Sequence, residues 1–451
     1  MAIPPQNCYE EPVFIFVSAG LLQPKKYDTR SNRLNRYLNY PLVGLATISV
    51  NCDIPAKVIH GNYDPPQQIA ASIPKNTRTI MLSLPSAYSI PWARSFTSVV
   101  RRRLPGVPII AGGRWVVDGR EDWIKLELGV DAAVPGMGEE FVCSLAGHAG
   151  NDHTISTYQT PDYTLMDDYR SYQPSLEVNR GCGHGCNFCT EADEPQSPLR
   201  SPLSTARELR RLCDLYSGLT IHPYLQSSLF QPNTKWIRDF ARIRNDLNID
   251  ATWRTEARAD TFSPAKIEAL AECGMRVIDI GLESGSPGQL LAMGKTRNPT
   301  AYLAAATRTL DACAQNGVLA KLNIVLYPGE SSTTIHETTQ WLEARRNLIA
   351  GISANPFIFF PTGYIHTLSP RMIALGASLV DDTQPGRLGY GDVHLSATIS
   401  NLEALRLCHD ISSNFMTLED YFNIKSFGYF QPGLTLSAFR SSALQDAMPV
   451  S

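Results

Sequence analysis

The sequence lacks several features that would assign it to a membrane or a polyanion. No stretch reaches the roughly 18 consecutive apolar residues of a spanning helix, and the N-terminal residues show no basic segment followed by a long apolar run. Strong charge of one sign is also missing, since 40 Lys and Arg face 43 Asp and Glu. No global field therefore attracts nucleic acid or an anionic membrane. We expect a cytoplasmic protein without membrane or nucleic-acid partners.

Clustered cysteines are scarce as well. Seven of the ten cysteines stand alone, at positions 8, 52, 143, 213, 273, 313 and 408. In a reducing compartment these are expected to be buried free thiols. Only Cys182, Cys186 and Cys189 lie together, in the stretch LEVNRGCGHGCNFCT at residues 176–190. Three thiols on one short loop indicate a chemical role such as metal binding.

The size and composition indicate two globular domains and an appendage. The chain has 451 residues, of which 43% are hydrophobic and 18% charged, which is too long for one ordinary core and too apolar for disorder. We expect a first domain over residues 1–150, a linker rich in turn formers over 151–174, a second domain over 175–360 and a C-terminal extension over 361–451.

The first domain alternates short apolar runs with segments of helical periodicity. The runs are PVFIFVSAG, AKVIHGNYD, TRTIMLSLPS, GVPIIAGG and VDAAVPGMG. This alternation predicts a parallel, doubly wound, Rossmann-like α/β sheet. Ligands of such sheets bind at the carboxyl ends of the strands, where Ser83, Gly112, Gly113 and Gly136 are expected. The glycines either allow a large ligand to approach the backbone or only form tight turns.

The second domain repeats the alternation with six expected strands. They cover residues 175–179, 222–227, 250–258, 276–282, 320–327 and 353–360. Six βα units are too few for an eight-stranded barrel and predict a partial barrel, (β/α)6, with its site at the carboxyl ends of the strands. The three cysteines follow the first of these strands and therefore lie at that rim.

Three thiols on one loop are compatible with a zinc site, an iron–sulfur cluster or an accidental grouping. Zinc needs a fourth ligand, but His184 is too close in sequence to Cys182 and Cys186, and no second Cys-x-x-Cys pair follows. A 4Fe–4S cluster can be held by three cysteines with one iron left open for another ligand. The pattern favours the iron–sulfur cluster.

The C-x-x-x-C-x-x-C spacing after the first barrel strand resembles the defining motif of the radical S-adenosylmethionine (SAM) superfamily. Further segments are similar to that family: WRTEARAD at residues 253–260, VIDIGLESGSPGQLLAMGKT at 277–296 and LNIVLYPGESSTT at 322–334. The resemblance implies a 4Fe–4S cluster on the three cysteines and SAM near Phe188, Arg258, Glu283 and Asn323. Two positions depart from the family pattern: Gln226 replaces an acidic residue, and the glycine before Pro-Gly-Glu is missing.

PGVPIIAGGRWVVDGRED and LGVDAAVPGMGEE resemble the cobalamin-binding domain that precedes many radical SAM enzymes, and NYPLVGLATIS at residues 39–49 is similar to its first helix. The resemblance implies cobalamin near Ser83, Gly112, Gly113 and Gly136. The Asp-x-His-x-x-Gly signature of an axial histidine is absent, and His60 followed by Gly61 does not replace it. Cobalamin without a histidine lower ligand is therefore expected, or a retained fold that has lost the cofactor.

Together the resemblances imply a radical SAM enzyme that forms a 5′-deoxyadenosyl radical. We expect a cobalamin-dependent methyltransferase that acts on an unreactive carbon or phosphorus centre of a small-molecule natural product, supplied with electrons by a flavodoxin or ferredoxin. The first alternative is a cobalamin-independent rearrangement, cyclisation or aminocarboxypropyl transfer. The second is a non-catalytic iron–sulfur sensor or carrier. In the C-terminal extension, only Tyr390, His394, Cys408 and His409 are candidates for chemistry, and ordinary fold roles compete with each.

Overall fold

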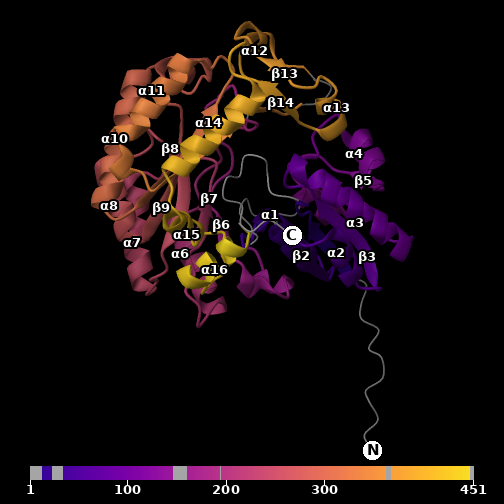
Figure 1. The fold of residues 1–451 in the computed structure, drawn as a ribbon. Coiled ribbons are helices and arrows are strands. Elements are labelled where there is room, and N and C mark those ends of the chain that lie inside the picture. Colours follow the sequence, from indigo (N-terminus) through magenta and orange to yellow (C-terminus); the bar gives the residue numbers. More distant parts are fainter. Residues whose placement is uncertain (1–12, 23–33, 146–159, 193, 362–366, 447–451) are drawn as a thin grey trace, which may run out of the picture. The chain divides into compact units, whose positions relative to one another are not determined.

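A computed structural model describes residues 13–22, 34–145, 160–192, 194–361 and 367–446 (Figure 1). The chain divides into two compact units. The first contains residues 39–169 and the strand at residues 13–18, and the second contains residues 34–38, 170–361 and the described residues from 367 onward. Cys8 and residues 151–159 of the expected linker lie outside the described residues. No helix in the described part of the chain has the length and apolar character needed to cross a membrane.

The first unit is a doubly wound parallel sheet, as predicted. Its strand order is β2-β1-β3-β4-β5, formed by β1 (Val13–Ser18), β2 (Ala56–His60), β3 (Thr77–Ser83), β4 (Ile109–Gly112) and β5 (Ala132–Ala133). The helices are α1 (Tyr40–Asn51), α2 (Pro66–Ser72), α3 (Ile90–Arg103), α4 (Glu121–Leu128) and α5 (Glu139–Leu145). All of β1 is buried, as expected of a central strand covered on both faces. The order reverses between β1 and β3, which is the position where ligands of such sheets bind.

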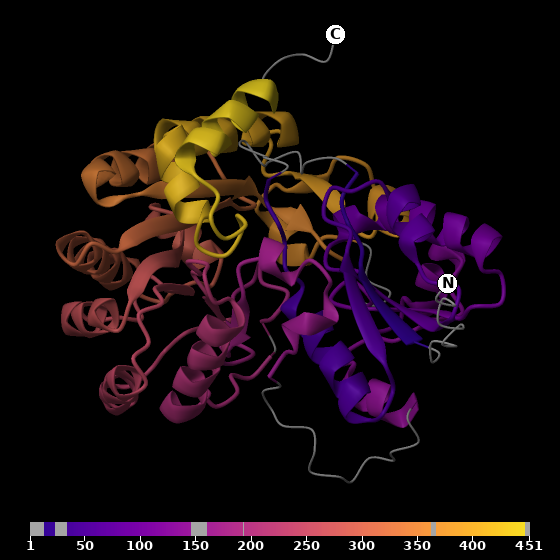
Figure 2. The same cartoon turned by 90° about the horizontal axis from the view of Figure 1, so that it is seen from below.

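The second unit contains a six-stranded parallel sheet in the order β11-β10-β9-β8-β7-β6. Its strands are β6 (Ser175–Glu177), β7 (Tyr224–Gln226), β8 (Trp253–Arg258), β9 (Met275–Glu283), β10 (Leu319–Leu326) and β11 (Gly351–Pro356). The helices α6 (Pro202–Leu215), α7 (Thr234–Asp246), α8 (Pro264–Glu272), α9 (Pro287–Ala292), α10 (Pro299–Gln315) and α11 (Ser332–Glu343) lie outside the strands (Figure 2). Within the described residues β6 and β11 do not pair with each other, so the barrel is partial and open, as predicted.

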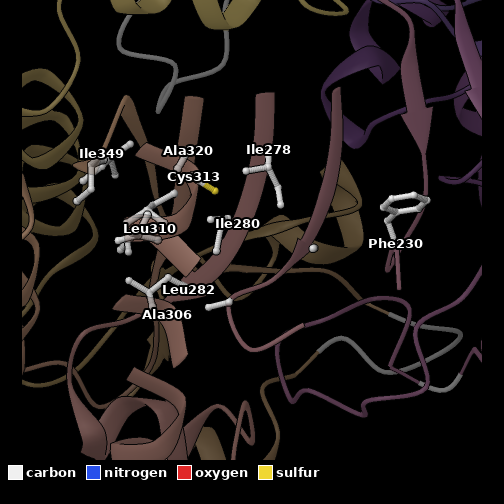
Figure 3. Close-up of a cluster of buried hydrophobic side chains, with 14 of the residues drawn as sticks. Phe230, Ile278, Ile280, Leu282, Ala306, Leu310, Cys313, Ala320 and Ile349 are labelled. Atoms are coloured by element: carbon white, nitrogen blue, oxygen red, sulfur yellow. The ribbon is translucent and has the colours of Figure 1, made fainter. Parts of the chain in front are cut away.

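Side chains of the barrel strands alternate between two environments. Those that point outward form the hydrophobic core with the helices, as Ile278, Ile280 and Leu282 of β9 do with Leu310 of α10 (Figure 3). The intervening residues of β9 and β10 include the charged Asp279 and Lys321, which are paired with each other. The interior face of the barrel is therefore polar where a closed barrel would carry branched aliphatic layers.

The expectation of a single strand over residues 353–360 is wrong in its second half. After β11 ends at Pro356, β12 (Ile358–Phe359) leaves the barrel and pairs antiparallel with β14 (Gly391–His394), which also pairs with β13 (Ser378–Leu379). Pro356 has no backbone N–H to continue a ladder, which favours the change of sheet. The remaining helices are α12 (Pro370–Ala374), α13 (Gln384–Leu388), α14 (Asn401–Asn414), α15 (Leu418–Lys425) and α16 (Leu436–Asp446). Helix α14 packs on the edge strand β11, where the Ser412 hydroxyl accepts the Ala354 N–H at 3.0 Å.

Candidate active site

The three clustered cysteines lie on the loop that follows β6. Its backbone is anchored to later segments: the N–H of Cys182 donates to the Glu194 carbonyl at 3.2 Å, and the N–H of Asn187 to the Met293 carbonyl at 2.8 Å. Gly181 has a φ of 68°, and a Cβ there would lie 2.2 Å from the Pro195 carbonyl oxygen. Only glycine fits that position, so the glycines around the cysteines allow the tight loop.

The donor chemistry of this loop fits an iron–sulfur cluster. Cys182, Cys186 and Cys189 are all free thiols, with Cys186 buried and the other two partly exposed. Among the described residues no three His, Cys, Asp or Glu side chains already converge on one metal position. The assignment therefore rests on three thiols within one anchored loop, a set that suits a cluster with one open iron. It stays a prediction.

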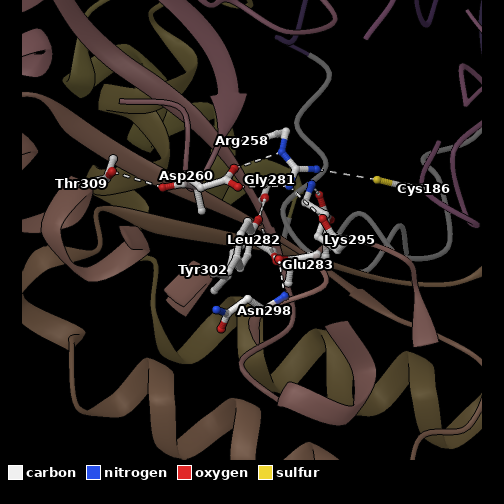
Figure 4. Close-up of polar contacts among 12 residues, drawn as sticks. Cys186, Arg258, Asp260, Gly281, Leu282, Glu283, Lys295, Asn298, Tyr302 and Thr309 are labelled. Atoms are coloured by element: carbon white, nitrogen blue, oxygen red, sulfur yellow. Dashed lines mark hydrogen bonds and ion pairs between the residues drawn. The ribbon is translucent and has the colours of Figure 1, made fainter. Parts of the chain in front are cut away.

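Arg258 connects the cysteine loop to the strand ends of the barrel (Figure 4). It ends β8, and its guanidinium lies 3.9 Å from the Cys186 sulfur although the two residues are 72 positions apart. The same guanidinium pairs with Asp260 at 3.0 Å and donates to the Lys295 carbonyl at 2.8 Å. Burial alone would lower the pKa of Arg258, but the Asp260 carboxylate raises it above its usual value. Arg258 is thus a fixed cation beside a predicted cluster ligand.

Glu283 lies at the end of the next strand in a constrained conformation. Its φ is 71°, a region that non-glycine residues rarely adopt and that often marks functional positions. The carboxylate accepts from the Lys295 ammonium at 3.0 Å, and both side chains are buried. A Cβ on Gly281 would lie 2.6 Å from the Glu283 carboxylate, so glycine leaves room for it. Phe188 from the cysteine loop lies close by, with the Lys295 ammonium 5.9 Å from its ring centre.

Asn323 extends the same row of side chains onto β10. The strand register pairs Arg258 with Gly281 and Gly281 with Asn323, which places these three positions in one layer across β8, β9 and β10. The Asn323 amide oxygen accepts from the Lys321 ammonium at 3.0 Å. The structure therefore brings Cys186, Phe188, Arg258 and Glu283 into one connected group, with Asn323 two strands from Arg258.

The sequence interpretation missed several residues of this group. Lys295 and Asp260 stood at the ends of the quoted family segments, but only the contacts show that they hold Glu283 and Arg258. Tyr302, whose hydroxyl donates to the Gly281 carbonyl at 2.7 Å, carries no motif at all. Gln226, at the departure from the acidic family pattern, ends β7 and donates weakly to the Ser175 hydroxyl at 3.4 Å.

The predicted cofactor residues of the first unit form a separate edge. Ser83 ends β3 and accepts from the Asn39 amide at 3.0 Å, while the same amide group donates to Ser18 at the end of β1 at 3.1 Å. Asn39 begins the segment that resembles the family's first helix, but the sequence did not indicate its contacts with the strand ends; it also caps α1. His60 is buried, and its Nε2 accepts the Asn39 backbone N–H at 2.9 Å. Burial lowers the pKa of His60 to about 4, so this imidazole stays neutral inside the fold.

The three glycines of that edge differ in what they would accommodate. A Cβ on Gly113 would lie 2.6 Å from the Ser83 hydroxyl, so the fold itself needs this glycine. A Cβ on Gly112 would make only an ordinary contact, at 3.6 Å from the Val134 carbonyl, and one on Gly136 would meet nothing within 4 Å. The fold therefore does not itself require glycine at position 112, whereas the φ of 76° favours glycine at position 136, where the space beside the backbone is open.

The other candidate positions belong to the fold or to the opposite end of the barrel. Burial raises the pKa of the Cys408 thiol far above its usual value, and the His394 Nδ1 accepts the Asn401 N–H at 3.1 Å. A cavity of about 550 Å³ is lined by His222, Arg276 and Phe427 among others. These residues lie at the amino ends of the strands or in the C-terminal segment, so the cavity is distant from the cysteine loop.

Comparison with known proteins agrees with this geometry. Residues 176–342, which span the cysteine loop, Arg258, Glu283 and Asn323, match the model of the Radical SAM superfamily. The barrel of this chain is a radical SAM domain. Such domains use a 4Fe–4S cluster and SAM, and the thiol loop and the charged group around Arg258 fit both.

Individual relatives extend the comparison to the whole chain at the level of fold. The radical SAM methyltransferase TsrM from Kitasatospora setae, solved with cobalamin and a [4Fe-4S] cluster, aligns with a TM-score of 0.62 at 16% identity, covering 88% of this chain and 81% of that one. The cobalamin-dependent SAM radical enzyme OxsB, solved with aqua-cobalamin and SAM, aligns with a TM-score of 0.56 at 14% identity, covering 97% and 66%. An uncharacterized methyltransferase of Pyrococcus horikoshii is 29% identical over 147 residues, which is 31% of each chain.

Proposed function

We propose that this protein reductively cleaves SAM and uses the resulting 5′-deoxyadenosyl radical in a cobalamin-dependent methylation of a small molecule. The observation that carries the proposal is the contact chain from Cys186 through Arg258 and Lys295 to Glu283. These residues come from two loops and two strands: Cys186 and Lys295 lie on loops, and Arg258 and Glu283 end β8 and β9. Their convergence is what binding SAM next to a cluster would require.

The residues of the chain have distinct parts in this proposal. Arg258 stays charged and offers its guanidinium to the SAM carboxylate, while Asp260 and the Lys295 carbonyl fix its orientation. Glu283 accepts hydrogen bonds from the SAM amino group or ribose, with Lys295 holding its carboxylate in place. Phe188 covers the adenine. Bound by the three cysteines, the cluster would supply the electron for cleavage.

The first unit supports the cobalamin part of the proposal. Its strand order reverses between β1 and β3, and ligands of such sheets bind near that position, which supports cobalamin binding at the edge with Ser83, Gly112 and Gly136. The aligned TsrM and OxsB structures contain cobalamin. His60 is neutral, buried and bonded to Asn39, which fits cobalamin without a histidine lower ligand. Bound there, cobalamin would carry the methyl group.

We propose a small molecule as the substrate, with a carbon or phosphorus centre that accepts the methyl group, and natural-product biosynthesis as the setting. The aligned TsrM structure was solved with tryptophan and a SAM analogue, which supports this class of substrate. A flavodoxin or ferredoxin would reduce the cluster. The nine described cysteines are free thiols, in keeping with a reducing cytoplasm.

The test is anaerobic reconstitution with iron, sulfide and hydroxocobalamin, followed by incubation with SAM and dithionite. We expect 5′-deoxyadenosine to form, and methyl-deuterated SAM to shift the mass of a methylated product. The protein with Cys182, Cys186 and Cys189 changed to Ala is the control. If deoxyadenosine forms although the protein binds no cobalt, the reaction is a rearrangement, a cyclisation or an aminocarboxypropyl transfer. If the loaded protein does not cleave SAM, the protein is a redox sensor or an iron–sulfur carrier.

A further inference from the structure

We propose that Lys321 and Asn323 form a carboxylate-binding position on the inner face of the barrel and that the substrate is an acid. Both residues lie on β10, where Ala320, Leu322 and Ile324 are buried in the outer core while the residues between them are partly exposed. Lys321 and Asn323 therefore share the inner face with Asp279 of β9, whose register partner is Lys321.

Lys321 is held in one orientation by two acceptors. Its ammonium donates to Asp279 at 2.8 Å and to the Asn323 amide oxygen at 3.0 Å, and its side chain keeps 13% exposure. An ammonium group has three N–H donors. Within the described part of the chain the third donor has no protein acceptor, so it is available to a ligand.

The same contact fixes which way the Asn323 amide points. Lysine can only donate hydrogen bonds, so the Asn323 atom that faces Lys321 must be the oxygen. The amide NH2 group then points the other way, and no acceptor for it is present among the described residues. Asn323 is thereby presented as a donor beside the free donor of Lys321.

Asp279 does not require Lys321 for neutralisation. Its second carboxylate oxygen accepts from Arg254 at 2.5 Å, and Arg254 is fixed in turn by the carbonyls of Ile424 and Phe427, each at 3.0 Å. Glu256, the register partner of Asp279 on β8, is a second carboxylate in this layer. The positive charges of Arg254 and Lys321 equal in number the negative charges of Asp279 and Glu256. The site is therefore defined by its open hydrogen-bond donors and not by a net charge.

A ligand oxygen at this position accepts one hydrogen bond from the Lys321 ammonium and another from the Asn323 amide. An anionic oxygen is favoured there, because charge-assisted hydrogen bonds are stronger than those between neutral groups. A carboxylate has two such oxygens and no donor that would repel these groups. The SAM carboxylate is assigned to Arg258, and Asn323, which the family resemblance placed near SAM, is assigned here to the substrate instead, so the acid bound at this position is the substrate. That last step rests on the proposed function, whereas binding of an acid at Lys321 and Asn323 does not.

The experiment uses protein reconstituted with its cluster and saturated with SAM, and acetate as probe with acetamide as its neutral match. Saturation-transfer NMR should detect acetate on the wild-type protein. Lys321→Met and Asn323→Asp should each weaken acetate binding by about tenfold or more, and Lys321→Arg should restore part of it. Lys235→Met, which removes an exposed lysine paired with Asp239 on α7, is the matched control and should bind acetate like the wild type.

SAM affinity and thermal unfolding are measured on the same samples. We expect SAM affinity within about twofold of wild type in Lys321→Met, which separates this position from the SAM site. Equal binding of acetate by wild type and Lys321→Met, or of acetate and acetamide by the wild type, would overturn the proposal. A parallel loss of SAM affinity would assign Lys321 to SAM instead. The acetate assay requires neither cobalamin nor turnover. Failure of the proposed methylation therefore leaves acetate binding unchanged, and the two proposals are tested separately.

Discussion

Replacement of Arg258 by glutamine tests the centre of the site most directly. The guanidinium makes three kinds of contact: an ion pair with Asp260 at 3.0 Å, a hydrogen bond to the Lys295 carbonyl at 2.8 Å, and an approach of 3.9 Å to the Cys186 sulfur. Glutamine keeps a polar side chain but removes the charge and the forked geometry. The change therefore separates the role of a cation from that of a space-filling residue.

The expected magnitudes differ for SAM affinity and for stability. Loss of a charge-assisted hydrogen bond costs about 1.5–3 kcal/mol, which corresponds to roughly 10- to 150-fold weaker SAM binding. Asp260, left without its cation, has 37% of its side chain exposed, so water replaces much of the lost pairing. The free energy of unfolding should then fall by only about 1–2 kcal/mol.

Anaerobic equilibrium dialysis with labelled SAM measures the affinity, and iron content with visible absorbance measures cluster loading. The matched control is Arg244→Gln, which removes a buried guanidinium on α7 that packs against Gly274. That variant should lose stability while binding SAM like the wild type. If Arg258→Gln instead binds SAM normally and unfolds more easily, Arg258 is a structural residue and the site assignment fails.

Three other outcomes are expected. Changing Cys182, Cys186 and Cys189 together to Ala should abolish iron binding and deoxyadenosine formation, and full cluster loading of this variant would refute the ligand assignment. Gly112→Leu should weaken cobalamin binding in a hydroxocobalamin titration while sparing the cluster, and equal cobalamin binding by wild type and Gly112→Leu would argue against a cobalamin site at that edge. Gly113→Ala should instead destabilise the first unit, because the added Cβ meets the Ser83 hydroxyl. Burial lowers the pKa of His60 and of His222 to about 4, so the unfolded chain binds more protons between pH 4 and 6.5 and stability should fall as pH falls through that window. Fully buried His60 should account for about 3 kcal/mol of this loss, and urea unfolding of His60→Asn should show a weaker pH dependence.

The sequence predicts the strands well because periodicity and burial agree in them. The apolar run at residues 13–17 lies in the buried β1, and each of the six expected barrel strands overlaps a strand of the parallel sheet. The error lies where a run of strand formers continues past a proline: residues 358–359 leave the barrel and pair with β14. Local propensity does not specify which sheet a short strand joins.

The candidate site shows the same division between motif and contact. Cysteine spacing and the family segments predict Cys186, Arg258 and Glu283 as site residues from sequence alone, and the structure brings these three into one connected group. Lys295, Asp260 and Asn39 lie within the family segments, but their roles become evident only through the groups that they hold in place. Orientation of a side chain by a neighbour from another strand is a property of the register, which no local pattern contains.

The charged side chains on the inner face of the barrel are not explained by a contribution to stability. Arg254, Asp279 and Lys321 are charged and mostly buried, and buried ion pairs often stabilise a protein no better than apolar side chains of similar volume. Parallel barrels otherwise fill this space with branched aliphatic residues. Here the C-terminal segment fixes Arg254 through two backbone carbonyls, Arg254 fixes Asp279, and Asp279 fixes Lys321 beside Asn323. This series of contacts ends in two open hydrogen-bond donors, on Lys321 and Asn323. Such donors serve the binding of a ligand, whereas a hydrophobic core would gain nothing from them.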